Sequence, residues 1–210
     1  RLLAMRGVNG EHIVVQEAVP GRPVGTRLTA AHQRLLAALA SGPARPAATS
    51  ALLTELPCRL AALPDKEAPV RPVLSWATRV LQSTMLPRTI LHGDFAPWNL
   101  RWWHGTLVAF DWEYARCDGV PLLDEVHHTV QVGFLLRGWT ASQALAKLAQ
   151  QARSGRHGLR PEEIEALQAI YLLDAFARRH EEGYPREDRL LKHYRDMLDR
   201  VAARPEVATA

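Results

Sequence analysis

The sequence predicts an α+β fold dominated by helices, with a short β region at its start and a β-hairpin near its middle. Three observations support this expectation. A β-branched apolar run at 12–16 is bounded by turn signals, and two short strand-like runs flank a polar loop within 90–113. From residue 122 onward, apolar residues recur at helical spacing almost to the end. Helices should therefore form the larger body of the protein.

Composition narrows the class of protein. With 210 residues, of which 47% are hydrophobic, the chain can bury the core of one large domain or two small ones. No apolar run approaches the roughly 18 to 20 residues that cross a bilayer, and the start lacks a signal-peptide pattern. A cytoplasmic protein with no membrane partner is expected. The formal charge of +4 comes from arginines interspersed with acidic residues, which predicts a solvated surface and no nucleic-acid partner.

The two cysteines give no sign of a disulfide or a zinc site. Cys58 and Cys117 lie far apart and outside any C-x-x-C or Cys/His spacing. We therefore expect two reduced thiols.

The first half of the chain should contain one strand and three helices. The strand at 12–16 ends before a Pro-Gly turn, and a helix at 28–40 ends at a Ser-Gly-Pro sequence. A connector rich in Pro and Ala contains a second helix at 50–62. A third helix, at 72–85, precedes Pro87.

The middle of the chain is expected to form a hairpin from strands at 88–92 and 106–112. A turn at His104-Gly105 and a polar loop separate these two apolar runs. Both ends of this hairpin would carry an aspartate.

The second half is predicted to be helical. Apolar periodicity, a proline at position 161 and a Gly-Tyr-Pro break define the expected helices. Their ranges are 121–137, 141–153, 161–181 and 187–203. The last several residues are expected to fray.

A constellation of polar residues lies between the two central strands. Asp94, Asn99 and Asp111 follow His92. Asn99 lies five residues after Asp94, and Asp111 lies twelve residues after Asn99. Carboxylate and amide oxygens are suited to Mg²⁺, and metal-assisted phosphoryl transfer also needs a group that orients the attacking hydroxyl. In this interpretation Asp94 orients the hydroxyl, while Asn99 and Asp111 hold Mg²⁺.

The motifs "HGDFAPWN" and "FDWEYA" together resemble the catalytic loop and metal-binding segment of the aminoglycoside phosphotransferase and choline kinase family, which has a protein-kinase-like fold. The order H-x-D-x-x-x-x-N, then a strand, then Asp, is the same as in protein kinases. This chain departs from the kinase pattern in having Gly93 in place of Arg and "DWE" in place of "DFG".

The resemblance implies a division of the chain and a role for several residues. Residues 1–24 would be a remnant of the N-terminal lobe with the hinge, and 25–205 a mostly helical C-terminal lobe with its catalytic loop at 90–113. Backbone groups near Glu17 and Val19 in the hinge would meet the adenine of ATP.

Two further side chains take supporting roles under the same resemblance. His92, although grouped with the catalytic residues, is expected to brace the loop and not to act as acid or base. Asp124 is expected to be a buried acid that accepts hydrogen bonds from the loop's backbone amides.

The lysine that anchors the triphosphate in this fold is missing from the sequence. It would precede the hinge, whereas Lys66, Lys147 and Lys192 all follow it. We expect a truncated form of a longer enzyme, with a relative that has lost its nucleotide lobe as the alternative. The second would be a pseudokinase or binding module without turnover. A metal-dependent phosphohydrolase using His92, Asp94 and Asp111 is disfavoured, because the histidines of a two-metal site are missing.

The phosphate acceptor is expected to be the hydroxyl of a small molecule such as a sugar, an amino alcohol or an aminoglycoside. An aminoglycoside would need an acidic pocket, whereas residues 140–204 carry nearly balanced charge. His127 and His128 are adjacent and should face different sides of a helix, so they cannot both bind one metal. The sequence leaves the oligomeric state open.

Overall fold

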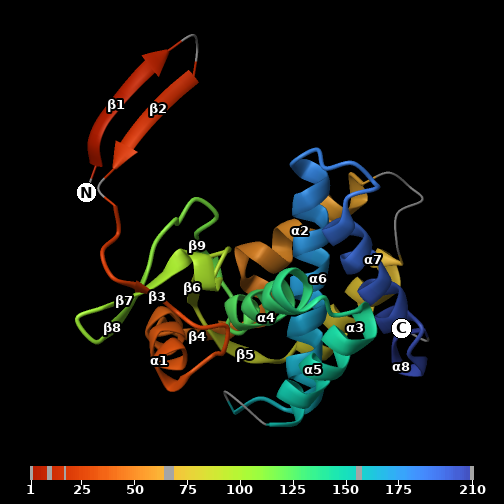
Figure 1. Ribbon diagram of the computed structural model, residues 1–210. Helices are drawn as coiled ribbons and strands as arrows, with labels where there is room; N and C mark the ends of the chain where they lie inside the picture. Colours follow the sequence, from red (N-terminus) through yellow and green to blue (C-terminus); the bar gives the residue numbers. More distant parts are fainter. Residues whose placement is uncertain (1, 9–10, 17, 64–68, 155–157, 209–210) are drawn as a thin grey trace.

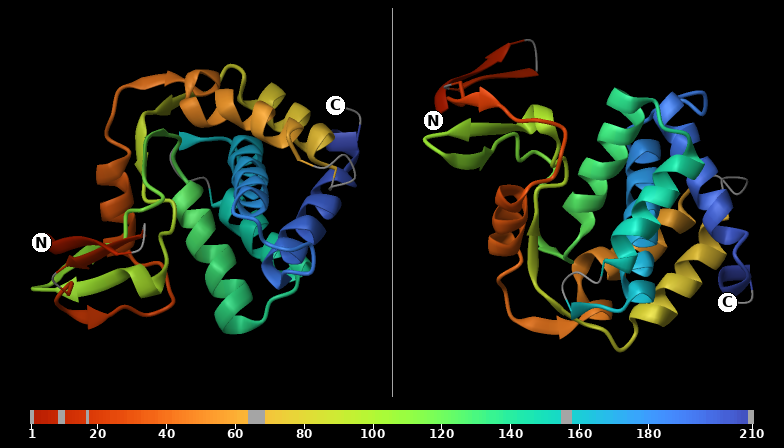
Figure 2. Two further views of the ribbon diagram at one scale, coloured as in Figure 1. Left: turned by 90° about the horizontal axis from the view of Figure 1, so that it is seen from above. Right: turned by 60° about the horizontal axis from the view of Figure 1, so that its bottom comes forward.

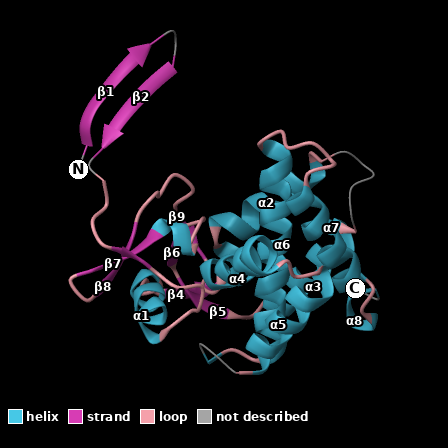
Figure 3. Cartoon of the chain, viewed as in Figure 1, coloured by secondary structure: helices cyan, strands magenta, loops and turns pink. Residues whose placement is uncertain are grey.

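The computed structural model describes residues 2–8, 11–16, 18–63, 69–154 and 158–208. Helices gather into one large body, and short strands lie to one side of it (Figures 1 and 3). The mixed class dominated by helices is confirmed, while the arrangement of kinase-like lobes stays a prediction.

The chain starts with an antiparallel pair of strands. Strand β1 (Leu2–Val8) pairs with β2 (Glu11–Gln16), which confirms the strand expected at 12–16. The pair stands apart from the rest of the chain in Figure 1. The next strand, β3 (Arg22–Pro23), joins the central strands by pairing with β7.

The central strands pair differently from the expected hairpin. They are β6 (Thr89–Leu91), β7 (Leu100–Trp103), β8 (Thr106–Ala109) and β9 (Arg116–Gly119). β8 pairs with β7, and β6 pairs with β9, so the predicted pairing of 88–92 with 106–112 is wrong. The reason is the turn: His104 and Gly105 have φ values of 48° and 78°. Two successive positive φ angles form a two-residue hairpin loop, which joins the segments immediately beside it.

The first three predicted helices are present. They are α1 (Ala30–Leu39), α2 (Ala51–Ala61) and α3 (Val70–Leu81). α3 ends earlier than the predicted residue 85, because Met85–Pro87 forms strand β5 against β4 (Ala44–Pro46). A short 3-10 turn, Ala47–Thr49, connects β4 to α2.

The later helices match the predicted ranges closely. They are α4 (Leu123–Gln131), α5 (Ala141–Arg153), α6 (Pro161–Glu181) and α7 (Arg189–Ala202). α4 continues as a π-helix over Val132–Leu136, which occupies the end of the range predicted as one helix. The expected fraying after residue 203 is wrong over 205–208, because Pro205–Ala208 forms a short helix, α8, that buries Val207.

Helix α6 is the centre of the helical body. Helices α2, α3, α4, α5 and α7 all pack against it, as Figure 2 shows from two sides. Buried side chains along its length include Leu167, Ile170 and Phe176. An apolar face this wide explains why α6 is the longest helix of the described chain. None of the described helices combines the length and the apolar character that crossing a membrane requires.

A second, smaller core lies under the polar loop. Phe95, Leu100 and Leu107 are buried together, and apolar side chains of α1, including Leu35, pack against them. Because Phe95 and Leu100 lie within and directly after the predicted catalytic loop, this core fixes the loop between the strands and the helical body.

Candidate active site

The part of the predicted catalytic loop that carries His92, Asp94 and Asn99 connects β6 to β7. It follows Leu91 and ends in the 3-10 turn Pro97–Asn99, with Phe95 completely buried at its centre. Asp94 lies next to this anchor and keeps a side chain that is 27% exposed. The loop therefore presents one carboxylate at the surface while its neighbours are fixed in the core.

Asp124, in the first turn of α4, holds the backbone of the loop. Its Oδ2 accepts a hydrogen bond of 2.8 Å from the His92 amide, and its Oδ1 accepts one of 3.0 Å from the Gly93 amide. Asp124 itself is buried. These contacts are those expected of Asp124 from the sequence.

His92 uses both ring nitrogens for structure. Nε2 donates to the Phe110 carbonyl oxygen at 2.8 Å, and Nδ1 accepts from the Asp94 amide at 3.3 Å. The ring also lies 4.5 Å, between centroids, from the ring of Trp112. With both nitrogens occupied and no exposed surface, His92 is placed to brace the loop.

Gly93 adopts a backbone conformation that its neighbours require. Its φ of 82° lies in the left-handed region, and a Cβ at this position would lie 2.3 Å from the carbonyl oxygen of Tyr114. The Gly93 carbonyl accepts a hydrogen bond of 3.0 Å from Nη1 of Arg178, a residue of α6. The Arg178 guanidinium also lies 4.7 Å from the centre of the Tyr114 ring. No sequence pattern indicated that Arg178 contacts this loop.

The two oxygens of Asp94 each accept a side-chain hydrogen bond. Oδ2 accepts from Nδ2 of Asn99 at 2.7 Å, and Oδ1 accepts from Nε2 of His127 at 2.7 Å. Burial acts to raise the pKa of Asp94, but the interactions of its carboxylate with His127, Asn99 and Trp98 outweigh burial and hold the pKa below its usual range. The contact with His127 was not predicted, because 33 residues separate the two side chains.

Asn99 and Asp111 meet at the open end of the β7–β8 hairpin. The Phe110 amide donates to the Asn99 carbonyl oxygen at 3.1 Å, which places Asp111 beside Asn99. Asp111 is exposed with a φ of 65°, whereas Asn99 is buried. The backbones of the two predicted metal ligands thus lie near each other at this end of the hairpin.

The donor set at this end of the hairpin fits Mg²⁺. Nδ2 of Asn99 is used by Asp94, so the amide oxygen is the atom of Asn99 suited to a metal. Within the described residues no three His, Cys, Asp or Glu side chains are grouped to hold a metal. An Mg²⁺ ion that binds phosphates takes only one or two carboxylates from a protein and completes its shell with water and substrate oxygens.

The predicted adenine contacts are only partly within the described chain. Val19 is half-buried, and Glu17 lies outside the described residues. Of the three lysines, Lys66 also lies outside them, while Lys147 and Lys192 are exposed on α5 and α7. The contact of the hinge with ATP therefore stays a prediction.

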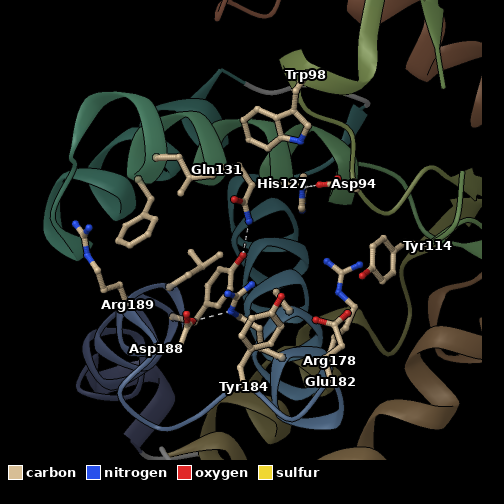
Figure 4. A pocket seen from close by; sticks show the side chains of 16 residues that line it. Asp94, Trp98, Tyr114, His127, Gln131, Arg178, Glu182, Tyr184, Asp188 and Arg189 are labelled. Carbon is tan, nitrogen blue, oxygen red and sulfur yellow. Dashed lines mark hydrogen bonds and ion pairs between the residues drawn. The ribbon is translucent and has the colours of Figure 1, made fainter. Parts of the chain in front are cut away.

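A cavity of about 420 Å³ opens beside Asp94 and His127 (Figure 4). Its aromatic walls come from the catalytic loop, the segment after β8 and the α6–α7 connection, and include Trp98, Tyr114 and Tyr184. Its ionisable groups are three carboxylates and three guanidinium groups besides His127 and the tyrosines: Asp94, Glu182, Asp188, Arg178, Arg179 and Arg189.

Comparison with known proteins identifies the family. The model of the phosphotransferase enzyme family, abbreviated APH, matches residues 1–161. The chain belongs to this phosphotransferase family. The matched range contains the catalytic loop, Asp111 and Asp124, and it confirms the resemblance to aminoglycoside phosphotransferases. No curated protein and no solved structure matches the chain.

Proposed function

We propose that this phosphotransferase uses ATP and Mg²⁺ to phosphorylate a hydroxyl group of a small molecule. The observation that carries the proposal is the place of Asp94. Its carboxylate is fixed by Asn99 and His127 at the wall of a cavity, and Asp111 lies at the nearby end of the β7–β8 hairpin. One side of Asp94 therefore faces space for an acceptor, and the other faces the predicted metal ligands.

In the proposed reaction Asp94 orients the acceptor hydroxyl and takes its proton. The hydroxyl oxygen forms a bond to the γ-phosphorus, the bond from that phosphorus to the bridging oxygen breaks, and ADP leaves. Asn99 and Asp111 would hold Mg²⁺, which neutralises charge on the phosphate oxygens. The lowered pKa of Asp94 keeps it ionised at neutral pH, as a proton acceptor must be.

The cavity favours a neutral or zwitterionic acceptor of about the size of a sugar or an amino alcohol. Its volume of about 420 Å³ lies in the usual range for small-molecule sites. Arg179 donates to Asp188 at 2.8 Å, so these two charges already compensate each other. Because the remaining carboxylates are matched by Arg178 and Arg189, the cavity lacks the excess of negative charge that a polycationic aminoglycoside would need.

We further propose that residues 25–205 form the substrate lobe of a kinase-like fold and that 1–24 contain the hinge. Because the family match covers 1–161, both proposed parts contain residues of the family. The alternative is a binding module that retains the loop without turnover.

The test is ADP release and acceptor phosphorylation by the full chain, measured with sugars, amino alcohols and aminoglycosides as acceptors. Asp94→Asn should lower kcat by about 10²-fold or more while the Kd for ATP changes less than about twofold. Asp111→Ala should abolish the increase in kcat that added Mg²⁺ produces in the wild type. Asp199→Asn, an exposed carboxylate on α7, is the matched control and should behave as wild type.

These measurements distinguish the active phosphotransferase from the binding module. Full turnover by Asp94→Asn would show that the assigned role is wrong. Binding of ATP by the wild-type chain without transfer to any acceptor would favour the binding module.

A further inference from the structure

A row of buried polar side chains leads from Asp94 into the helical body. Nε2 of His127 lies 2.7 Å from Oδ1 of Asp94, and Nδ1 of the same ring lies 3.2 Å from the Tyr171 hydroxyl. That hydroxyl lies 3.1 Å from the Tyr194 hydroxyl, to which Nε2 of Gln131 donates at 2.8 Å. The row joins α4, α6 and α7, and Figure 4 shows His127 directed toward Asp94.

The hydrogens along this row can be assigned from its two ends. An ionised Asp94 only accepts, so Nε2 of His127 must carry a hydrogen. At the other end the Gln131 amide donates to Tyr194, which leaves the Tyr194 hydroxyl hydrogen for Tyr171. Tyr171 then donates its own hydrogen to Nδ1 of His127. Every hydrogen bond therefore points toward Asp94.

We propose that His127 is a positioning residue for Asp94, fixed as its Nε2–H tautomer by the row Gln131–Tyr194–Tyr171. This inference rests on the proposed function in one respect, that Asp94 is the residue that meets the acceptor hydroxyl. The imidazole N–H holds Oδ1, and Asn99 holds Oδ2, so the carboxylate plane cannot rotate away from the cavity.

The tautomer can be measured without any turnover. Long-range ¹H–¹⁵N spectra of the full chain with labelled histidine distinguish an Nε2–H ring from an Nδ1–H or doubly protonated ring, and the missing signals of His127→Gln assign the residue. Where the ring is neutral, His127 should be the Nε2–H tautomer. In Tyr171→Phe the tautomer should persist, but the Nδ1 resonance should move because its donor is lost. An Nδ1–H tautomer of His127, or an unmoved Nδ1 resonance, would overturn the assignment.

Kinetics test the positioning role itself. His127→Leu removes the donor and should lower kcat about 10-fold to 100-fold with less than about a threefold change in KM for the acceptor. His127→Gln keeps a side-chain N–H and should recover most of kcat. His128→Leu is the matched control, because it replaces the adjacent buried histidine of α4, whose ring faces His32 and Phe95. It should keep the wild-type kcat.

A double variant shows whether His127 acts through Asp94. If it does, adding His127→Leu to Asp94→Asn should cost little further activity, because the partner of the donor is already altered. Additive losses, or a wild-type kcat in His127→Leu, would contradict the proposal. If His127→Leu unfolds, the tautomer measurement and the kinetics of His127→Gln still test the proposal. If wild-type protein transfers no phosphate, the proposed function fails, while the tautomer measurement still decides the assignment of His127.

Discussion

Gly93→Ala is expected to destabilise the protein strongly, because the added methyl group is unfavourable for two separate reasons, the backbone conformation and a steric overlap. An alanine at φ 82° pays about 1 to 2 kcal/mol for the left-handed conformation. The new Cβ would lie 2.3 Å from the Tyr114 carbonyl oxygen, where real Cβ contacts are essentially never shorter than 3.0 Å. Relieving such an overlap in a packed site costs about 1 to 3 kcal/mol. The free energy of unfolding should therefore fall by about 2 to 5 kcal/mol.

Gly105→Ala separates these two costs. Gly105 has a similar φ of 78°, and nothing lies within 4 Å of a Cβ built there. This variant should lose only the backbone cost, about 1 to 2 kcal/mol. Urea unfolding at constant m-value gives both differences. Equal destabilisation by the two variants would refute the reasoning, because the approach of Tyr114 to Gly93 would then carry no cost.

Two other predictions concern acids that hold the fold together. Asp124→Ala leaves the His92 and Gly93 amides without their acceptor, so the free energy of unfolding should fall by about 3 kcal/mol, with faster hydrogen exchange at both amides; unchanged exchange would contradict this. Glu163 accepts from the Arg160 side chain and backbone and from the Thr84 hydroxyl, and the hydrogen bond with the Arg160 side chain is the main cause that lowers the pKa of Glu163 to about 2. Because the folded-state pKa is below the unfolded value of 4.5, this stabilisation is present above pH 4.5 and is lost as the pH falls toward 2. Glu163→Gln should lower the free energy of unfolding at pH 7 by about 1 to 2 kcal/mol. In thermal unfolding, the variant should also lose less stability than the wild type as the pH falls from 4.5 toward 2. An unchanged dependence of stability on pH would contradict this prediction.

The helices could be predicted where local chemistry fixes their ends. Helix α5 begins after Thr140, which forms a capping box with Gln143, and α6 begins at Pro161 with Glu163 in its first turn. These signals lie within three residues of the boundary. The predicted bounds at 141–153 and 161–181 therefore agree with the structure.

The strand pairing was less predictable, although one signal for it was present. The His104-Gly105 turn was recognised, and a two-residue turn requires Trp103 and Thr106 to be neighbours. That requirement places a strand at Leu100–Trp103, a segment that had been taken as part of the polar loop. The partner of β6 follows from tertiary packing and leaves no local signal.

The motif of the candidate site could be predicted from the sequence, but the side chains that hold the motif in place could not. Asn99 contacts Asp94, and the β7–β8 hairpin places Asp111 beside Asn99 along the backbone, while the roles assigned to the three residues stay predictions. His127, Arg178 and the buried tyrosines come from helices far along the chain, and only the packing of α4 and α6 brings them to the loop. No spacing rule reveals contacts of that kind.

The outside support of the catalytic loop limits how the motif can be reused. The acceptors and donors that hold its backbone belong to Asp124 on α4 and Arg178 on α6. A designer who grafted "HGDFAPWN" onto another protein would transfer the side chain of Asp94 without the contacts that orient the loop. The smallest portable unit is the loop together with these two helices, and a variant library meant to change the chemistry should include positions on both.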